Sequence, residues 1–201
     1  MLGAVLTAKR QRIYALGLLL LTLASNVSGA ELRFSLRDVD GVEHRQSEWA
    51  GKRAIVLFFK TIDCPLSNGY VPEMNRFRQE YAQRGVAFYG VEADTTLAVS
   101  EVKRHAKEFG FTFPVLIDKQ QILGHSSGAT ATPEVAVLSN TGQVLYLGRI
   151  DNRVEDFDKR RNVVTEHDLR DALEAVLAGR PVARPRTKVV GCAINYPEGH
   201  P

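Results

Sequence analysis

Apolar residues along this chain fall into short continuous runs and into stripes of helical spacing. AIVLFF at 54–59 is apolar at every position, and VAFYGVEA at 86–93 is nearly so. Such runs predict strands that are covered on both faces of a sheet. Between them, apolar residues recur at steps of three and four, as on one side of a helix: Tyr70, Met74, Phe77 and Tyr81. We therefore expect a strand, a helix from Pro65 to Arg84 and a second strand.

The second half of the chain continues this alternation and adds a hairpin. A helix is predicted from Asp94, which is placed to cap it, to about Phe109. FPVLID predicts a short strand, and EVAVLS and QVLYLGRI on either side of the turn NTG predict a hairpin. A capping box at 165–168 precedes a last helix, LRDALEAVLAG. These elements predict an α/β sandwich with the 54–59 strand at its centre.

The composition predicts one domain with short extensions. The chain has 201 residues, of which 44% are apolar, and its formal charge is +3. Residues 1–30 contain Lys9, Arg10 and Arg12 and no acid. Taking these three from the 26 Lys and Arg leaves 23, which equals the 23 Asp and Glu. The remainder is neutral, so nothing favours nucleic-acid binding, which requires a clustered basic face.

Residues 1–30 have the pattern of an export signal. The basic residues precede an apolar stretch, Ile13 to Ala24, whose length of about 12 residues is too short to span a bilayer. Ser28-Gly29-Ala30 supplies small residues for cleavage after Ala30. We expect a periplasmic or secreted protein with no stable membrane insertion after cleavage; the alternative is an uncleaved N-terminal anchor. Export implies an oxidising compartment, in which a disulfide persists.

Cys64 stands where the predicted central strand ends and a helix begins. Backbone N–H groups at a helix start are unpaired and the helix dipole is positive there, so both favour a thiolate. Pro65 fits the first helical turn, where a missing N–H costs nothing. We therefore expect a solvent-facing, nucleophilic Cys64. The alternative is a buried cysteine that behaves as a small apolar residue.

Two prolines complete a familiar arrangement. Pro72 lies eight residues after Cys64, inside the predicted helix, and Thr132-Pro133 stands directly before the strand EVAVL, where a cis bond would mark a constrained turn. With Cys64-Pro65 at a helix start, the chain resembles the thioredoxin superfamily. The lead-in EWAGKRAIVLFF and the insert from about residue 95 to 117 resemble its redoxin branch, which includes the alkyl hydroperoxide reductase/thiol-specific antioxidant proteins.

The resemblance implies a thioredoxin-like sandwich, a central mixed β-sheet flanked by helices. It covers about Leu32 to Gly179. We accordingly expect a signal peptide at 1–30, a redoxin domain at 31–179 and an irregular tail at 180–201 that carries Cys192.

The local motif departs from each redox branch of that superfamily. Ser67 stands where a thioredoxin has its second cysteine, and Asn68 where the copper-delivery relatives have theirs. Thr61 matches the threonine of a peroxiredoxin, but Leu57 occupies the place of its proline. The motif around Cys64 therefore holds a single thiol on every comparison.

Thiol–disulfide exchange is the first functional hypothesis. Cys64 would attack a partner disulfide, and Cys192 is the candidate resolving cysteine. By resemblance, the backbone before Pro133 would align the partner chain as an added strand. A structural Cys64–Cys192 disulfide that only pins the tail is the alternative.

Peroxide reduction is the second hypothesis, and a non-catalytic binding module is the third. In the second, Cys64 would become a sulfenic acid, Thr61 would orient the peroxide and Arg149 would supply a positive charge beside the thiolate. In the third, the fold would bind a partner or copper, but the five histidines have no close ligand spacing with either cysteine: His44, His105, His125, His167 and His200.

The remaining sequence features carry no further chemistry. His105 and His167 lie on predicted helices and are expected to be solvated, and residues 151–161 alternate in charge as a solvated loop does. No phosphate-binding glycine motif is present, so we expect no cofactor. The histidine spacing leads us to expect no bound metal in the favoured hypotheses. The partner is a protein thiol or disulfide, or a peroxide; the electron donor and the oligomeric state stay open.

Overall fold

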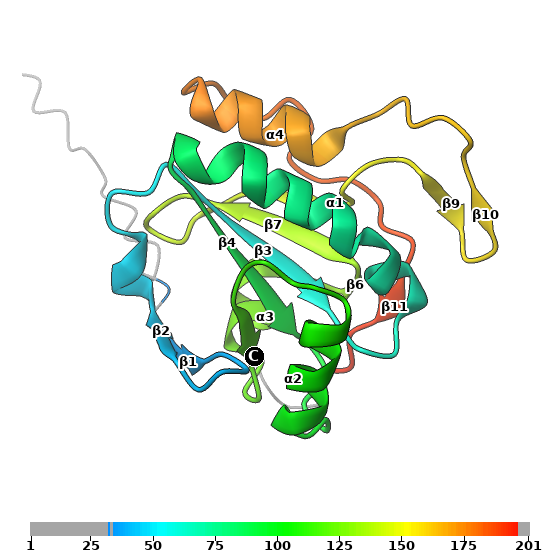
Figure 1. The fold of residues 1–201 in the computed structure, drawn as a ribbon. Coiled ribbons are helices and arrows are strands. Elements are labelled where there is room, and N and C mark those ends of the chain that lie inside the picture. Colours follow the sequence, from blue (N-terminus) through cyan, green and yellow to red (C-terminus); the bar gives the residue numbers. More distant parts are fainter. Residues whose placement is uncertain (1–31, 33, 197–201) are drawn as a thin grey trace, which may run out of the picture.

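A five-stranded mixed sheet in the order β5–β4–β3–β7–β8 forms the centre of the protein (Figure 1). The computed structural model describes residue 32 and residues 34–196. β3 (Ala54–Lys60), β4 (Val86–Glu92) and β5 (Val115–Ile117) are parallel, whereas β7 (Glu134–Leu138) and β8 (Val144–Gly148) run antiparallel to their neighbours. β3 is central and buried at all seven positions, which confirms the strand predicted from 54–59 and the mixed sheet.

Helices cover both faces of this sheet. α1 (Pro65–Tyr81) and α4 (Asp168–Leu177) lie together on one face, and α3 (Ile122–Ser127) lies on the other (Figure 1). α2 (Val99–Glu108) packs its buried side beside β5. The remaining elements are short: β1 (Ser35–Arg37), β2 (Glu43–Arg45), η1 (Gln46–Trp49), η2 (Ala82–Arg84), β6 (Ala131–Thr132), β9 (Val154–Asp156), β10 (Lys159–Arg160) and β11 (Cys192–Ala193).

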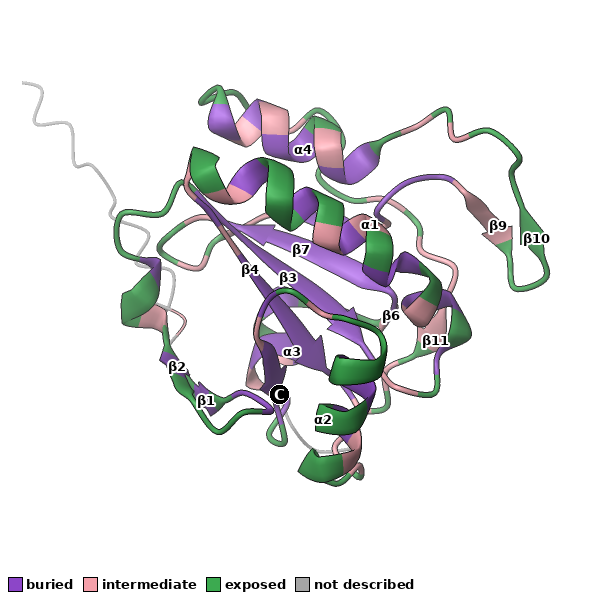
Figure 2. Cartoon of the chain, viewed as in Figure 1, coloured by how far each residue is buried: buried purple, intermediate pink, exposed green. Residues whose placement is uncertain are grey.

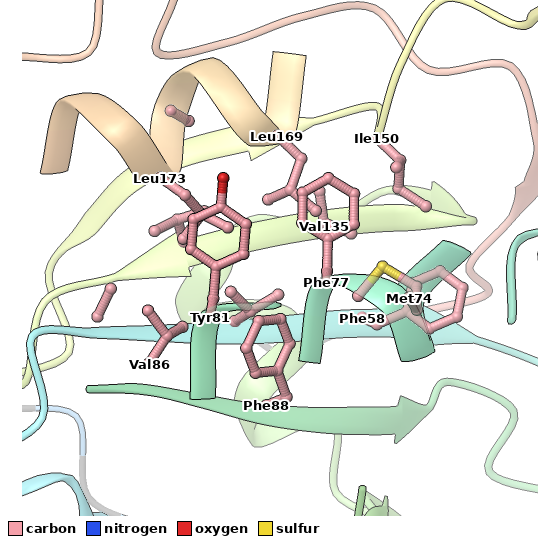
Figure 3. Packing of buried hydrophobic residues seen from close by; sticks show 14 of the residues in the cluster. Phe58, Met74, Phe77, Tyr81, Val86, Phe88, Val135, Ile150, Leu169 and Leu173 are labelled. Atoms are coloured by element: carbon pink, nitrogen blue, oxygen red, sulfur yellow. The ribbon is translucent and has the colours of Figure 1, made fainter. Parts of the chain in front are cut away.

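The alternation of side chains along β3 divides the core into two layers. Ala54, Val56 and Phe58 pack with α1 and α4, whereas the residues between them pack with Trp49 on the opposite face. Figure 3 shows the first layer, with aromatic rings and Met74 of α1 set between the sheet and α4. The sheet is buried throughout its centre, and the helices expose only their outer sides (Figure 2). This two-sided burial explains why β3 is apolar at successive positions.

α2 begins later than the sequence predicted. The Asp94 carboxylate accepts hydrogen bonds from the N–H and the hydroxyl of Thr96, so the chain makes a local turn there instead of starting a helix. The helix starts at Val99, where the Glu101 carboxylate accepts the N–H of Ala98.

The segment before α4 also differs from the prediction. The predicted capping box does not form, because the side-chain oxygen of Asn152 accepts the N–H groups of Thr165 and Glu166. The charged segment 151–161, predicted as a solvated loop, contains the β9–β10 hairpin, which projects from the body of the molecule (Figure 1). Sequence alternation of charge did not distinguish a loop from a short exposed hairpin.

α1 runs without interruption through Pro72, and the Thr132–Pro133 bond is cis. Within the described residues, no helix combines the length and the apolar composition that a membrane crossing requires. The predicted export signal at 1–30 lies outside the described residues, so its cleavage stays a prediction.

Truncation in the layer of Figure 3 tests this core. Phe77 is 3% exposed, and its ring stacks on Tyr81 at 5.8 Å between centroids. We expect Phe77→Ala to lower the free energy of unfolding by about 3–5 kcal/mol, because it removes a large buried ring and leaves a cavity. Guanidinium unfolding measures the loss. Val163→Ala is the control, since Val163 is 69% exposed and a change within about 0.5 kcal/mol is expected; a loss below about 1 kcal/mol for Phe77→Ala would contradict this packing.

Candidate active site

Cys64 is the residue that caps the start of α1. The chain leaves β3 at Lys60, turns through a hydrogen bond from the Cys64 N–H to the Thr61 carbonyl (3.2 Å), and enters the helix at Pro65. The Cys64 carbonyl accepts the N–H of Asn68 at 3.0 Å, which closes the first helical turn. The structure therefore places this thiol at the positive end of α1, as the sequence predicted.

Cys192 meets Cys64 across 128 positions of sequence. β11 pairs antiparallel with β6, with Cys192 opposite Thr132. The Cys192 Sγ lies 3.0 Å from the Cys64 Sγ, and both cysteines are free thiols. The Cys192 thiol donates to the Cys64 sulfur at this distance, which is short for a contact of two sulfurs and longer than the roughly 2.05 Å of a covalent S–S bond. A small movement would bring the two sulfurs to bonding distance.

The Cys64 side chain is buried, whereas the sequence analysis expected it to face solvent. Its exposed fraction is 0%. The Thr132 carbonyl oxygen lies 3.1 Å from the Cys64 Sγ, and Cys192 contacts the same sulfur. The expectation of an open thiol was wrong because β6 and the tail meet at the start of α1, and no local sequence feature indicates that meeting.

The two thiols have pKa values displaced in opposite directions. Burial acts to raise the pKa of Cys64, but the hydrogen bond from Cys192, the backbone N–H of Ser67 and contacts with Thr132 together lower it below that of an ordinary thiol. Burial, together with the neighbouring Cys64, raises the pKa of Cys192 to about 11. At neutral pH, Cys64 is therefore the better nucleophile and Cys192 keeps its proton, which it donates to the Cys64 sulfur.

Pro133 and Glu134 shape the strand beside the cysteines. Thr132 directly precedes the cis Pro133 bond, and its carbonyl oxygen lies 3.1 Å from the Cys64 Sγ. The Glu134 carboxylate, 5% exposed, accepts the N–H groups of Thr130 (2.6 Å) and Ala131 (3.2 Å). Sequence reasoning selected Pro133 but missed Glu134, which holds β6 in place.

Thr61 contacts Cys64 through its backbone carbonyl. Its carbonyl accepts the Cys64 N–H, while its hydroxyl makes no hydrogen bond of ordinary geometry among the described residues. Thr61 and Thr132 line a pocket of about 180 Å³ together with the turn at 93–96 and tail residues 193–195. The pocket adjoins the cysteines, although neither cysteine lines it.

A buried ion pair underlies the site and was missed by the sequence analysis. Lys60 Nζ lies 2.6 Å from Glu92 Oε2, and the two side chains are 0% and 2% exposed. Burial lowers the pKa of Lys60 and raises that of Glu92, and their mutual attraction opposes both effects. The signal was present in the sequence, since AIVLFFK and VAFYGVE are parallel strands that each end in a charge of opposite sign and pair in register.

His105 is buried, so its predicted solvation is wrong. Its ring is 7% exposed, stacks on Phe109 at 4.3 Å between centroids, and contacts the Asn68 side-chain oxygen through Nε2 at 2.9 Å. Burial, with the Lys60 charge nearby, lowers the pKa of His105 to about 4. Asn68 in turn donates to the Ile62 carbonyl at 2.8 Å, so this pair fixes the loop before Cys64.

Arg149 is not brought to the cysteines. Its guanidinium group binds Asp168 at 2.7 Å and also Glu166, at the start of α4. The expectation of a positive charge beside the thiolate fails because Glu166, before α4, and Asp168, the first residue of α4, hold this side chain. The positive end of α1 and the hydrogen bonds to its sulfur are what act on Cys64 instead.

Histidines are spread over the described structure and form no metal site there. Within residue 32 and residues 34–196, no group of three His, Cys, Asp or Glu side chains is arranged to hold a metal ion. His125 lies on α3, where its ring contacts Tyr196 of the tail at 4.4 Å between centroids.

The fold and the paired cysteines define a protein of the thioredoxin-like class. The family model described as Redoxin matches residues 28–165. This is more than half of the chain, so the chain belongs to the redoxin family, as the resemblance implied.

Similar proteins support this assignment. The thiol-disulfide oxidoreductase ResA of Geobacillus thermodenitrificans is 30% identical over 111 residues, which are 55% of this chain and 62% of that protein. The match thus spans less than two thirds of the length of that relative. Two solved structures are similar over most of both chains: a hypothetical protein from Sinorhizobium meliloti 1021 (26% identity, TM-score 0.70, 84% and 93% covered) and an uncharacterized conserved protein from Geobacillus kaustophilus (28%, 0.69, 85% and 92%).

Replacing Cys192 tests the electrostatic coupling of the two thiols. We expect Cys192→Ala to raise the pKa of Cys64, because the S–H donor that stabilises the thiolate is lost while the positive helix end remains. Cys192→Ser is the matched control, since its hydroxyl still donates and should keep the pKa nearer to that of the parent protein. Thiolate absorbance at 240 nm, followed against pH, gives each value. A Cys64 pKa in Cys192→Ala that equals that of the parent protein would show that Cys192 does not stabilise the thiolate.

The Lys60–Glu92 pair makes a second prediction. Lys60→Met should lower the free energy of unfolding by about 3–5 kcal/mol, because it leaves Glu92 buried without its partner. The double change Lys60→Met/Glu92→Leu should recover most of that loss. Chemical unfolding at pH 7 measures both. The control is Lys103→Met, which breaks an exposed pair with Asp40 and should cost less than about 1 kcal/mol; an equally small loss for Lys60→Met would exclude a tightly coupled pair.

Proposed function

We propose that the protein is an exported thiol–disulfide oxidoreductase in which Cys64 is the nucleophile and Cys192 resolves the mixed disulfide. The contact of 3.0 Å between their sulfurs carries this proposal. The oppositely displaced pKa values support the division of roles, and the similarity to thiol-disulfide oxidoreductases supports the class of reaction. The proposal includes a signal at 1–30, a redoxin domain at 31–179, the tail at 180–201 and a periplasmic or secreted location.

Exchange would proceed in two displacements. The Cys64 thiolate attacks one sulfur of a partner disulfide, so a Cys64–partner S–S bond forms, the partner's own S–S bond breaks, and the leaving thiolate takes a proton from solvent. Cys192 then gives up its proton to solvent and attacks the Cys64 sulfur, which forms the Cys64–Cys192 disulfide and releases the second partner thiolate. The partner gains two electrons and the chain loses two. An external dithiol reductant would return the chain to its starting state.

The geometry favours this division over the thioredoxin arrangement within one helical turn. Ser67 is buried in α1 and offers no second thiol, while Cys192 supplies one from the opposite side, across β6. Cys192 stays protonated before the mixed disulfide forms, because burial and the neighbouring Cys64 raise its pKa. From then on, the Cys64 sulfur no longer carries the charge that raises the pKa of Cys192, so attack by Cys192 becomes easier.

Peroxide reduction is the second candidate, and the pocket lined by Thr61 and Thr132 is the observation that favours it. Cys64 would take one oxygen from the peroxide to give a sulfenic acid and an alcohol or water, and Cys192 would condense with it to a disulfide and water. Arg149 is bound to Asp168, so it does not supply the positive charge that peroxide reduction was expected to use beside the Cys64 thiolate. Consumption of hydrogen peroxide with a dithiol donor, lost in Cys64→Ser, would favour this candidate.

Single-cysteine variants test the exchange activity. The reduced protein is mixed with a disulfide-bonded peptide, and products are identified by non-reducing mass spectrometry. Cys64→Ser should form no adduct and lower the rate of peptide reduction at least 100-fold, because the nucleophile is lost. Cys192→Ser should accumulate the Cys64–peptide mixed disulfide, because no thiol resolves it.

The two variants control each other, since each keeps one thiol. If the parent protein already holds a Cys64–Cys192 bond that resists mild reductant, and neither variant forms an adduct, the bond only pins the tail and the exchange proposal fails.

A further inference from the structure

The edge of β6 determines which residue of a paired strand lies beside Cys64. β6 ends at Thr132, directly before the cis Pro133 bond, and the Thr132 carbonyl lies 3.1 Å from the Cys64 sulfur. An extended chain paired antiparallel with β6 therefore holds the residue opposite Thr132 next to the nucleophile. Backbone pairing of this kind is a common way to bind a peptide at a sheet edge.

The chain's own tail occupies this edge. β11 is the antiparallel neighbour of β6, Cys192 is the residue opposite Thr132, and the Ile194 N–H donates to the Thr130 carbonyl at 2.9 Å. Figure 1 shows β11 lying beside β6. The place that the cysteine of a bound partner strand would take is filled by Cys192.

The docked part of the tail is short and is separated from its upstream anchor. Upstream, the Thr187 N–H donates to the Leu147 carbonyl at 3.2 Å. Downstream, the Gln121 side-chain amide donates to the Asn195 carbonyl and the Tyr196 hydroxyl donates to the Ala129 carbonyl, both at 2.8 Å. Between them, residues 188–191 make no hydrogen bond to any other described residue. A two-residue strand behind such a stretch belongs to the part of a structure that opens at low free energy.

Gly191 permits the close approach that seats Cys192. A Cβ atom at this position would lie 2.3 Å from the Thr132 carbonyl oxygen and 2.8 Å from its carbon, both of which are backbone atoms. No side-chain rotation relieves such a contact, so β11 pairs with β6 in this register only with glycine at 191.

We propose that β11 and an extended, cysteine-containing segment of a partner protein compete for the β6 edge, so that the tail leaves to admit a protein disulfide and returns to resolve it. This inference rests on the proposed exchange activity and on the expected binding of the partner as a strand. It adds that the chain's own β11 occupies the same edge and must leave first. The buried Cys64 sulfur becomes reachable when β11 leaves. Return of β11 delivers Cys192 and expels the partner strand in one movement.

Gly191→Ala in the full chain tests the competition, because it disturbs the pairing of β11 without itself replacing a cysteine. The first displacement is measured in the Cys192→Ser background, with a disulfide-bonded extended peptide and with 2-hydroxyethyl disulfide. Gly191→Ala should raise both rates, because Cys64 is buried under β11. It should raise the peptide rate at least fivefold more than the small-disulfide rate, since the small disulfide needs only access to the Cys64 sulfur, whereas the peptide also needs the whole β6 edge. With Cys192 present, the same change should slow resolution of the mixed disulfide at least tenfold.

Gly69→Ala is the matched control. It adds the same methyl group to α1, where the nearest neighbour is the flexible Arg160 side chain at 3.4 Å, and should alter neither step more than twofold. Tyr196→Ala loosens the far end of the tail and should act in the same directions as Gly191→Ala.

The failures are distinguishable. Normal mixed-disulfide formation with an unchanged rate ratio, or with resolution as fast as in the parent protein, overturns the competition alone. The absence of any mixed disulfide with either reagent in all variants overturns the exchange activity itself.

Discussion

The antiparallel pairing of β11 with β6 brings together two residues that are 128 positions apart, and the chemistry of the molecule depends on it. Without that pairing, Cys64 is a single thiol at a helix start with a serine three residues on. With it, the same thiol gains a hydrogen-bond donor and a second sulfur at 3.0 Å. The usual thioredoxin arrangement places both sulfurs within one helical turn; here a separate strand supplies the second.

Hydrogen bonds and a buried ion pair fix β6 and the residues around Cys64. Glu134 fixes the start of β6 by accepting the N–H groups of Thr130 and Ala131, and Asn68 fixes the loop on the other side of Cys64. The central strand β3 is buried on both faces and ends in Lys60, whose charge is matched by Glu92 in the next strand. Cys64 therefore stands on a hydrogen-bonded base, while Cys192 directly follows residues 188–191, which make no hydrogen bond to other described residues.

Local patterns predicted most of the fold and the place of Cys64 within it. The apolar runs gave β3 and β4, the stripe of aromatic residues gave α1, and the turn NTG gave the β7–β8 hairpin, because each of these depends on neighbours in sequence. The position of Cys64 at the start of α1 follows from the same local signals. Helix starts were predicted less accurately. Asp94 accepts a hydrogen bond from Thr96 in a local turn, and α2 begins at Val99.

What could not be predicted depends on contacts between distant segments. The place of Cys192, the burial of Cys64 and the capture of Arg149 by Asp168 all follow from tertiary packing that leaves no local pattern. A loop that joins sulfurs 128 positions apart has a further consequence. In the chain-entropy description, closing it as a disulfide would stabilise the folded chain by about 5 kcal/mol. Oxidation of the two thiols would thus link the C-terminal segment covalently to the start of α1. The oxidised protein would then resist unfolding more strongly than the reduced protein.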